Sequence, residues 1–276
     1  MNEKKKQSDL GIIIVTYNPD VSELLSNVSK YIKTAHKVII IDNSETAFNF
    51  SILEENNKIE IIRLNSNKGI AYAQNLGIEY FLNDDTINYI LFFDQDSFLN
   101  ASQINELYQN YKYFEESGVK IGLVGPTINN KKSGIDDVEE TLSSGSLIKK
   151  DRFIYVGSFN ESLFIDLVDY DWCWRARYIG YSIKVNNNVF LNHKLGEGKK
   201  LIFKVSKEFR HYYQFRNAIV LSSKIYIPKK YKIKIKFSLP IKFIVYTTIF
   251  NNRKLRFNYI IKGIKDGKNK KLGKMT

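Results

Sequence analysis

Two aspartates, Asp94 and Asp96, directly follow the apolar run Tyr-Ile-Leu-Phe-Phe at residues 89–93. Side chains two residues apart in an extended segment project to the same side, so both carboxylates can face one hard cation. This spacing predicts a Mg²⁺ or Mn²⁺ site. An Asp-x-Asp pair after a strand is also typical of a solvated turn, so the pair alone leaves both interpretations open.

The elements that must position these residues are short apolar runs rich in β-branched residues. They span residues 11–15, 37–41, 59–64, 89–93 and 120–124. Nearly continuous hydrophobicity is typical of parallel strands covered on both faces. Apolar residues at three- and four-residue intervals between these runs, clearest at 67–82, predict helices. The alternation predicts an α/β fold with a doubly wound, mostly parallel central sheet. Further on we expect an exposed loop at 129–140, a strand around 141–148 and a helix at 166–179.

Polar residues follow four of the predicted strands. In doubly wound sheets, ligands bind at the carboxyl ends of the strands. The four segments are therefore expected to converge on one crevice; they are Thr16-Tyr17-Asn18-Pro19, Asp42-Asn43-Ser44, Asn65-Ser66-Asn67-Lys68-Gly69 and Asp94-Gln95-Asp96-Ser97. The chain contains neither G-x-G-x-x-G nor G-x-x-x-x-G-K-[ST], which argues against a standard dinucleotide site and a P-loop.

The composition narrows the class of protein. The 276 residues are 43% hydrophobic and 14% aromatic, enough for a large core, so intrinsic disorder is excluded. A single cysteine, Cys173, excludes an intramolecular disulfide and a cysteine-rich zinc site. The net charge of +13 comes from the C-terminal part, because residues 194–276 hold 23 basic and 3 acidic residues.

No segment looks like an export signal or a membrane span. The apolar run at residues 12–15 is too short for a signal peptide. The longest later apolar stretch, residues 237–250, contains Pro240 and Lys242 and falls short of the roughly 20 residues that cross a bilayer. We therefore expect a cytoplasmic protein.

Several segments together resemble the bacterial family 2 glycosyltransferases, and within them the rhamnosyltransferase branch. They are IIIVTYNPD, VIIIDNSE, NSNKGIAYAQNLGI, YILFFDQDSF, SGSLI, GSFNESLFIDLVDYDWCWRARYIGYSI, VFLNHKLG and HYYQFRNAIVL, in the family's order. The resemblance implies the type A glycosyltransferase (Rossmann-like) fold, a nucleotide-sugar donor, a divalent cation and inversion at the anomeric carbon. It places a catalytic domain at residues 11–221, between a basic tail at 1–10 and a basic, helix-rich section at 222–276.

The resemblance also assigns a donor site. Its residues are Thr16, Tyr17 and Asn18 at the nucleobase, Asp42 at the base or ribose, Asn67 and Gly69 in a loop over the nucleotide, Asp94 at the ribose or metal, and Gln95. Asp96 would bind the cation that stabilises the charge on the departing diphosphate. Without the resemblance, Asp42 reads as a turn or helix cap, and Gly69 as a residue that permits a backbone turn.

The catalytic base is also assigned by resemblance. Alignment on Trp-Cys-Trp-Arg places it at Asp169, with Asp171 as the second choice, and Val168 stands where the wider family has Glu. Such a carboxylate would take the proton of the acceptor hydroxyl. Alternatively, both acids complement the dipole at the start of a helix. Arg175 is expected to pair with one of them.

The remaining assignments each have an ordinary structural alternative. The resemblance makes His193 a third metal contact, and otherwise it is a strand-end histidine bound to backbone. Contacts to the acceptor or diphosphate are predicted at Asp171, Trp172, Arg175, His211 and Arg216. His211 and Arg216 lie at helical spacing with Tyr212, which equally suits a buried aromatic seam.

The basic C-terminal section contains an amphipathic pattern. Phe257, Ile260, Ile261 and Ile264 fall on one helical face, opposite Lys254, Lys262 and Lys265. This pattern favours a helix on an anionic membrane surface, where a lipid-linked acceptor would be reached. Packing of that face on the catalytic domain is the alternative. Nucleic acid is the least favoured partner, because no nucleic-acid-binding motif is present.

The sequence therefore predicts a metal-dependent, inverting glycosyltransferase on the inner face of the cell membrane. Its donor is expected to be dTDP-rhamnose and its acceptor a saccharide of a surface polysaccharide such as capsule, O-antigen or cell-wall glycan. The near alternative is another nucleotide hexose, such as a UDP-sugar. From a different class, the chain would be a membrane-surface or nucleic-acid-binding protein with structural acidic strand ends.

Overall fold

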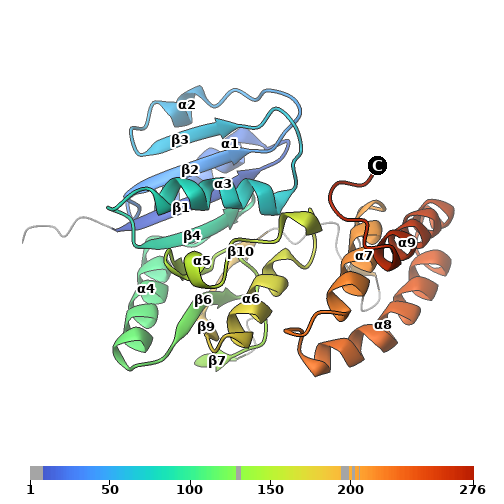
Figure 1. The fold of residues 1–276 in the computed structure, drawn as a ribbon. Coiled ribbons are helices and arrows are strands. Elements are labelled where there is room, and N and C mark those ends of the chain that lie inside the picture. The colour runs from blue at the N-terminus through green and yellow to red at the C-terminus, as the bar shows by residue number, and fades with distance from the viewer. Residues whose placement is uncertain (1–8, 129–131, 194–198, 201–202, 205) are drawn as a thin grey trace, which may run out of the picture.

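A twisted sheet forms the centre of the computed structural model, which describes residues 9–128, 132–193, 199–200, 203–204 and 206–276 (Figure 1). The strand order is β3-β2-β1-β4-β8-β6-β9-β7. The bounds are β1 (Leu10–Thr16), β2 (Lys37–Asp42), β3 (Ile59–Arg63), β4 (Tyr89–Asp94), β6 (Ile121–Thr127), β7 (Ile135–Asp137), β8 (Leu147–Lys149) and β9 (Ser182–Phe190). Strands β3, β2, β1 and β4 are parallel, as are β6 and β9, whereas β8 is antiparallel to β4 and β6. The predicted mostly parallel sheet is confirmed.

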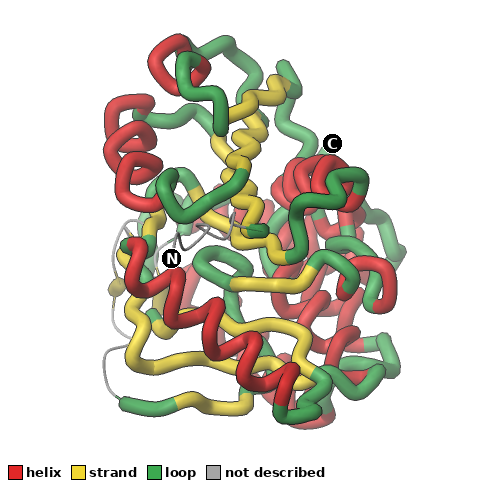
Figure 2. The backbone as a smooth tube through the Cα atoms, turned by 90° about the vertical axis from the view of Figure 1, so that its left-hand side faces the viewer, coloured by secondary structure: helices red, strands yellow, loops and turns green. Residues whose placement is uncertain are grey.

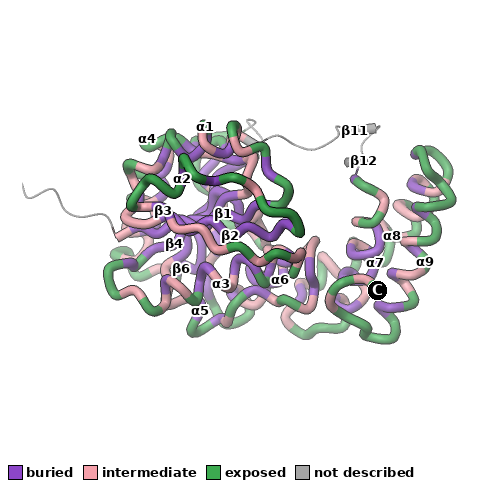
Figure 3. The backbone as a smooth tube through the Cα atoms, turned by 90° about the horizontal axis from the view of Figure 1, so that it is seen from above, coloured by how far each residue is buried: buried purple, intermediate pink, exposed green. Residues whose placement is uncertain are grey.

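Helices cover both faces of this sheet, as Figure 2 shows. They are α1 (Val21–Tyr31), α2 (Ser51–Glu54), α3 (Ile70–Leu82), α4 (Ala101–Glu116), α5 (Arg152–Tyr155), the 3₁₀ helix η1 (Glu161–Leu163) and α6 (Val168–Tyr178). Alternate residues of β1 enter opposite layers: Ile13 packs in the cluster that contains residues of α3 and α6, and Ile12 in the one that contains residues of α1 and α4. Strands β1, β2, β4 and β6 are accordingly buried over nearly their whole length (Figure 3).

Two expectations for the middle of the chain need correction. The segment expected to be an exposed loop at 129–140 contains β7, which pairs with β9 at the sheet edge; residues 129–131 lie outside the described part. The strand expected at 141–148 shrinks to β8. Its first part forms turns instead, because Ser146 donates from its hydroxyl to the Leu142 carbonyl at 2.6 Å and from its N–H to the Ser143 carbonyl at 2.8 Å.

Three helices form a separate group beside the carboxyl ends of the strands: α7 (Arg210–Ser222), α8 (Lys229–Thr248) and α9 (Arg253–Lys268). Helices α7 and α9 pack with their backbones close together. A Cβ atom at Gly263 would lie only 2.4 Å from the carbonyl oxygen of Tyr212, so the close approach requires glycine at this position. The helix-rich C-terminal section is confirmed. Within the residues that the structure describes, no helix is long and apolar enough to cross a membrane.

Two short pairs complete the structure. Strand β5 (Ser97–Phe98) is antiparallel to β10 (Asn192–His193), and β11 (Lys199–Lys200) to β12 (Phe203–Lys204). The first pair brings the backbone of His193 opposite Ser97, immediately after the Asp-x-Asp segment.

Candidate active site

The ends of β1 and β2 are joined through Asp42, which is 2% exposed. Thr16, its neighbour in the parallel register, donates a hydrogen bond to Asp42 Oδ1 at 3.1 Å. Ser44 donates to the same oxygen from its hydroxyl at 2.6 Å and from its N–H at 3.2 Å. The Ser44 hydroxyl in turn accepts from the Asn18 N–H at 2.8 Å. Asp42 therefore organises the turn that follows β2, beside the predicted crevice. This is the structural role that sequence reasoning left open.

The loop after β3 is tied to the end of β2. Asn43 donates to Asn67 Oδ1 at 3.3 Å, and that oxygen also accepts from the Gly69 N–H at 3.0 Å. Gly69 has φ +91°, and a Cβ there would lie 2.7 Å from the carbonyl oxygen of Phe164. Only glycine therefore fits between this loop and the segment that precedes α6.

The end of β4 carries the Asp-x-Asp pair beside the end of β1. Asp94 pairs with Val15 in the parallel register, and Gln95 Oε1 accepts a hydrogen bond from the Tyr17 N–H at 2.7 Å. Asp94, Gln95 and Asp96 are all partly exposed. The ends of β1, β2 and β4 and the loop after β3 are thus joined at the carboxyl end of the sheet, where the sequence predicts a ligand-binding crevice.

The second acidic segment reaches this crevice through Ser143 and Ser144. Ser144 Oγ accepts a hydrogen bond from the Asp94 N–H at 3.1 Å. Ser143 donates to Asp169 from its hydroxyl and from its backbone N–H. Two adjacent serines therefore hold Asp94 and Asp169 on either side of one short loop.

The carboxyl group of Asp169 is unusual. Desolvation, together with the negative charges of Asp94 and Asp166, raises its pKa to about 7, although the hydrogen bonds from Ser143 act in the opposite direction. Asp169 is partly exposed, so a ligand in the crevice can reach it. A carboxylate with a pKa near neutrality is a suitable general base.

The segment before α6 is strained and firmly held. Phe164, Asp166 and Leu167 have φ of 64°, 66° and 65°, which is rare for residues other than glycine. Asn217 Nδ2 donates to the carbonyl oxygens of Leu163, Ile165 and Asp166, at distances of 2.8–3.1 Å. Asn217 of α7 thus fixes the backbone that precedes Asp169.

Comparisons with known proteins agree with this geometry. The sequence profile of Glycosyl transferase family 2 matches residues 11–160. The "dTDP-rhamnosyl transferase RfbF" of Shigella flexneri is 32% identical over 248 residues, which cover 79% of this chain and 81% of that protein. The chain belongs to glycosyl transferase family 2.

More distant relatives and solved structures share the fold. A "Low-salt glycan biosynthesis hexosyltransferase Agl10" of Haloferax volcanii is 25% identical over 79% of this chain and 76% of its own length. The crystal structure of GalNAc-T7 with UDP, GalNAc and Mn²⁺ superposes with a TM-score of 0.63 at 13% identity, covering 96% of this chain and 56% of that one. For S. aureus TarS 1-349 in complex with UDP-GlcNAc, the TM-score is 0.60 at 16% identity, with 94% and 81% covered. The type A glycosyltransferase fold is confirmed.

Five predicted contact residues of this glycosyltransferase have partners inside the protein. Asp171 is fully buried, accepts from Arg175 Nε at 2.9 Å and from the Tyr226 hydroxyl at 2.7 Å, and so confirms the expected acid–arginine pair. Arg175 also donates to the carbonyls of Val156 and Ser158, and the buried Trp172 donates to that of Gly157 at 2.9 Å. The structure therefore gives these three residues structural partners rather than a place in the crevice.

His211 and Arg216 are also buried. His211 contacts Arg256 and stacks on Tyr246, and desolvation together with the Arg256 charge lowers its pKa to about 4. Arg216 Nη2 donates to the Leu163 carbonyl at 2.8 Å. The structure thus shows the buried aromatic seam for both residues, and places neither in the crevice.

Sequence reasoning missed an arginine that does reach the site. Arg210 binds Asp166 through two nitrogens, with Nη2–Oδ1 at 2.5 Å and Nε–Oδ2 at 3.2 Å. The charges of Asp166, Asp94 and Asp169 all contribute to the raised pKa of Arg210, with that of Asp166 largest. Its position directly before His211 in the motif HYYQFRN was the available signal, but helical spacing alone could not show which residue faces the crevice.

The donor set suits a cation held partly by substrate. Among the described residues, no three His, Cys, Asp or Glu side chains are grouped as a ready-made metal site. Mg²⁺ is commonly held by one or two carboxylates together with substrate phosphates, and the partly exposed Asp94 and Asp96 fit that arrangement. The backbone of His193 lies beside this segment, whereas its side chain falls outside the described part.

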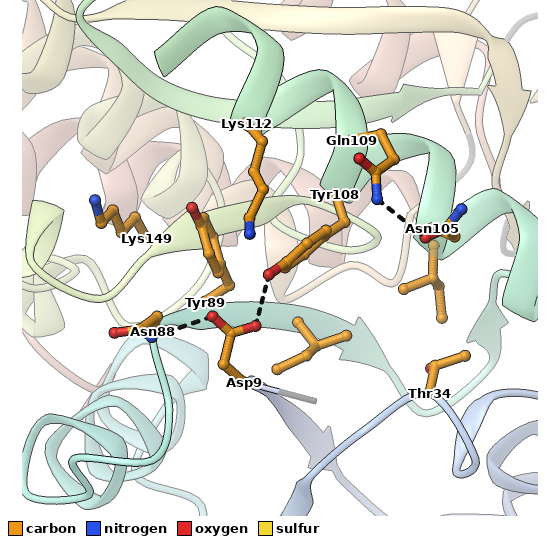
Figure 4. Close-up of a pocket in the computed structure, with 11 residues that line it drawn as sticks. Asp9, Thr34, Asn88, Tyr89, Asn105, Tyr108, Gln109, Lys112 and Lys149 are labelled. Carbon is orange, nitrogen blue, oxygen red and sulfur yellow. Dashed lines mark hydrogen bonds between the residues drawn. The ribbon is translucent and has the colours of Figure 1, made fainter. Parts of the chain in front are cut away.

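A hollow of about 930 Å³ lies elsewhere, at the amino ends of β1 and β4 (Figure 4). There Asp9 accepts hydrogen bonds from Tyr108 at 2.7 Å and from Asn88 at 3.1 Å. Ligands of doubly wound sheets bind at the opposite edge, so we do not assign the donor to this hollow.

Proposed function

We propose that this transferase moves L-rhamnose from dTDP-rhamnose to a saccharide acceptor of a surface polysaccharide, such as capsule, O-antigen or cell-wall glycan, with inversion. The similarity to a dTDP-rhamnosyl transferase over most of both chains supports the donor. The observation that carries the chemistry is Asp169, whose raised pKa and position across Ser143 and Ser144 from Asp94 suit a general base beside a donor site.

In the proposed reaction, the Asp169 carboxylate removes the proton from the acceptor hydroxyl. The resulting oxygen bonds to the anomeric carbon while the bond from that carbon to the phosphate oxygen breaks, and its electron pair leaves with dTDP. Asp94 and Asp96 would hold Mg²⁺ or Mn²⁺, with His193 as a further candidate ligand; such a cation supplies positive charge that stabilises the departing diphosphate.

The strand ends would bind the nucleoside. Thr16, Tyr17 and Asn18 would line the nucleobase pocket. In addition to its structural role through Oδ1, Asp42 would accept hydrogen bonds from the base or ribose through its other carboxylate oxygen. Gln95 already holds the backbone of Tyr17, and so would shape that pocket indirectly.

A donor screen tests the sugar nucleotide. Purified protein with a polysaccharide acceptor fraction should release dTDP from dTDP-rhamnose faster than it releases UDP or GDP from the corresponding hexose donors. Preferred release of UDP would contradict the rhamnose assignment while leaving the family unaffected.

The cation assignment is tested with Asp96→Ala. Because one of two carboxylate ligands is lost, dTDP affinity measured by calorimetry in Mn²⁺ should fall at least about tenfold. In EDTA, variant and wild type should bind dTDP alike. Equal affinities with and without EDTA would count against a cation at this position.

We also propose that the enzyme works at the inner face of the membrane, and the structure changes which helix is expected to face the lipid. On α9, Ile260 is fully buried and Ile264 packs with it, so only part of the predicted stripe is exposed. Helix α8 instead exposes a row at four- and three-residue spacing, consisting of Ile233, Phe237, Ile241 and Ile244, each 53–64% exposed. Lysines neighbour this row along the helix, which suits an anionic bilayer.

Vesicle sedimentation tests this assignment. Phe237→Ser with Ile241→Ser should reduce binding to phosphatidylglycerol vesicles more than Lys254→Gln, Lys262→Gln and Lys265→Gln together, because hydrophobic insertion requires the α8 row. Phosphatidylcholine vesicles are the control for charge. Wild-type binding to neither lipid would defeat the membrane assignment.

A further inference from the structure

A second hollow, of about 470 Å³, lies between the start of α6 and helices α7 and α8. Its polar lining includes Asp166, Tyr170, Ser206, Lys234, Ser238 and Lys242. Leu167, Phe215, Ile235 and Leu239 contribute apolar surface. Asp169 does not itself line the hollow, but Asp166 does and lies close enough to Asp169 for its charge to act on that carboxyl group, so the hollow lies near the proposed base. Its volume is that of an ordinary small-ligand site.

The hollow has an excess of positive charge. Lys234, Ser238 and Lys242 follow one another at four-residue spacing and so share one face of α8. In the part of the chain that the structure describes, no ion pair engages Lys234 or Lys242. The carboxylate of Asp166, which also lines the hollow, is already bound by two nitrogens of Arg210.

These two cations lie close enough to affect each other. Desolvation and then the positive charge of Lys234 lower the pKa of Lys242, while Asp166 acts weakly in the opposite direction. An anion placed between the two lysines would relieve this repulsion, and phosphate oxygens accept strong hydrogen bonds from ammonium groups. Each of Lys234, Ser238 and Lys242 directly follows a residue of the exposed Ile233–Phe237–Ile241 row, so the hollow and the proposed lipid-facing surface occupy adjacent sides of α8, about 100° apart.

We propose that this hollow binds a phosphate or diphosphate group carried by the acceptor. The inference rests on the proposed function, because it places the acceptor hydroxyl at Asp169 and the acceptor phosphate between Lys234 and Lys242. The apolar wall would accommodate the first carbons of a chain attached to that phosphate. The donor diphosphate belongs at Asp94 and Asp96, which do not line the hollow.

Calorimetry with two soluble probes tests the site. Geranyl diphosphate and inorganic pyrophosphate are titrated separately into the full chain in EDTA, so that no cation can bind either probe at the Asp-x-Asp segment. The Lys234→Gln, Lys242→Gln double variant should bind at least about tenfold more weakly than wild type, since two charged hydrogen-bond donors are lost. Tighter binding of geranyl diphosphate than of pyrophosphate would indicate a lipid-borne phosphate, and equal binding a soluble one.

A matched variant controls for general charge loss. Lys230→Gln with Lys236→Gln removes two lysines from the same helix that do not line the hollow, and should retain wild-type affinity. Equal loss in both double variants, unchanged affinity in the Lys234 and Lys242 variant, or no wild-type binding of either probe would overturn the proposal.

Titration of dTDP with Mn²⁺ separates this proposal from the function on which it rests. The Lys234 and Lys242 variant should bind dTDP as wild type does, because the proposed donor residues Asp94 and Asp96 do not line the hollow. If wild type binds the phosphate probes but fails to bind dTDP, the proposed function fails while the anion site stands. If dTDP binds normally but neither phosphate probe does, only the anion site fails.

Discussion

Two nearly adjacent aspartates lie on different sides of helix α6 and have different hydrogen-bond partners. Asp171 points into the core, where Arg175 and Tyr226 satisfy both of its oxygens. Asp169 lies on the side of Ser143, which supplies its hydrogen bonds, and no arginine of the described residues is bound to it. The comparison indicates that a buried carboxylate with a cationic partner stabilises the structure. A carboxylate without such a partner keeps a pKa suited to proton transfer.

The largest effect is expected for Asp169→Asn, which tests whether this residue is the base. An amide cannot accept the proton of the acceptor, so turnover should fall about 10²- to 10⁴-fold while dTDP binding in Mn²⁺ stays nearly unchanged. Sugar transfer and dTDP affinity are measured on the same preparation. Turnover within a few fold of wild type would show that the base is another residue.

The next change tests the structural role of Asp171. Asp171→Asn should lower the free energy of unfolding by about 3 kcal/mol, because it leaves the Arg175 guanidinium without its buried counter-charge. Urea denaturation measures this loss. Tyr226→Phe is the graded control, since it removes one hydrogen bond and should cost about 1 kcal/mol. An Asp171→Asn protein as stable as wild type would remove the distinction between the two sides of α6.

The smallest expected effect is a shift in the pH dependence of kcat/KM, which depends on the protonation of Asp169. Because the base must be deprotonated, kcat/KM should rise with pH through about 7, the raised pKa of Asp169. Ser143→Ala removes a hydrogen bond that favours the carboxylate, so the rising limb should move to higher pH by about one unit, the equivalent of one such bond.

Ser144→Ala is the matched control for the pH profile. The Ser144 hydroxyl accepts from the Asp94 backbone and is not bound to Asp169, so this change should leave the position of the limb unaltered. A limb that moves equally in both variants, or in neither, would mean that Ser143 does not set the protonation of the base.

The support for Ser143 comes from Gln74, which sequence reasoning did not single out. Its Nε2 donates to Ser143 Oγ at 2.9 Å from within α3, whereas its Oε1 is a buried atom with no hydrogen-bond partner in the described structure. The residue belongs to the motif NSNKGIAYAQNLGI, in which the resemblance assigns only Asn67 and Gly69 to the loop over the nucleotide. The pattern could not reveal this role, because residue 143 is far away in the chain.

The sequence by itself determined strands β1, β2, β3, β4 and β6, the polar residues that follow the first four of them, the acidic helix and the family. These features depend on local periodicity and on motifs that are contiguous in the chain. It also paired Arg175 with an acid, because residues four apart on a helix are neighbours.

Only the tertiary structure decided which side chains face the crevice. Asp171 is held away from the crevice by its hydrogen bond from Tyr226, 55 residues away in the chain. His211 is held away from it by its contact with Arg256, 45 residues away. The same packing buries Ile260 of α9 and leaves the α8 row exposed. Helical spacing shows which residues share a face, but which face is covered depends on partners brought together by folding, since burial is a property of the packed chain.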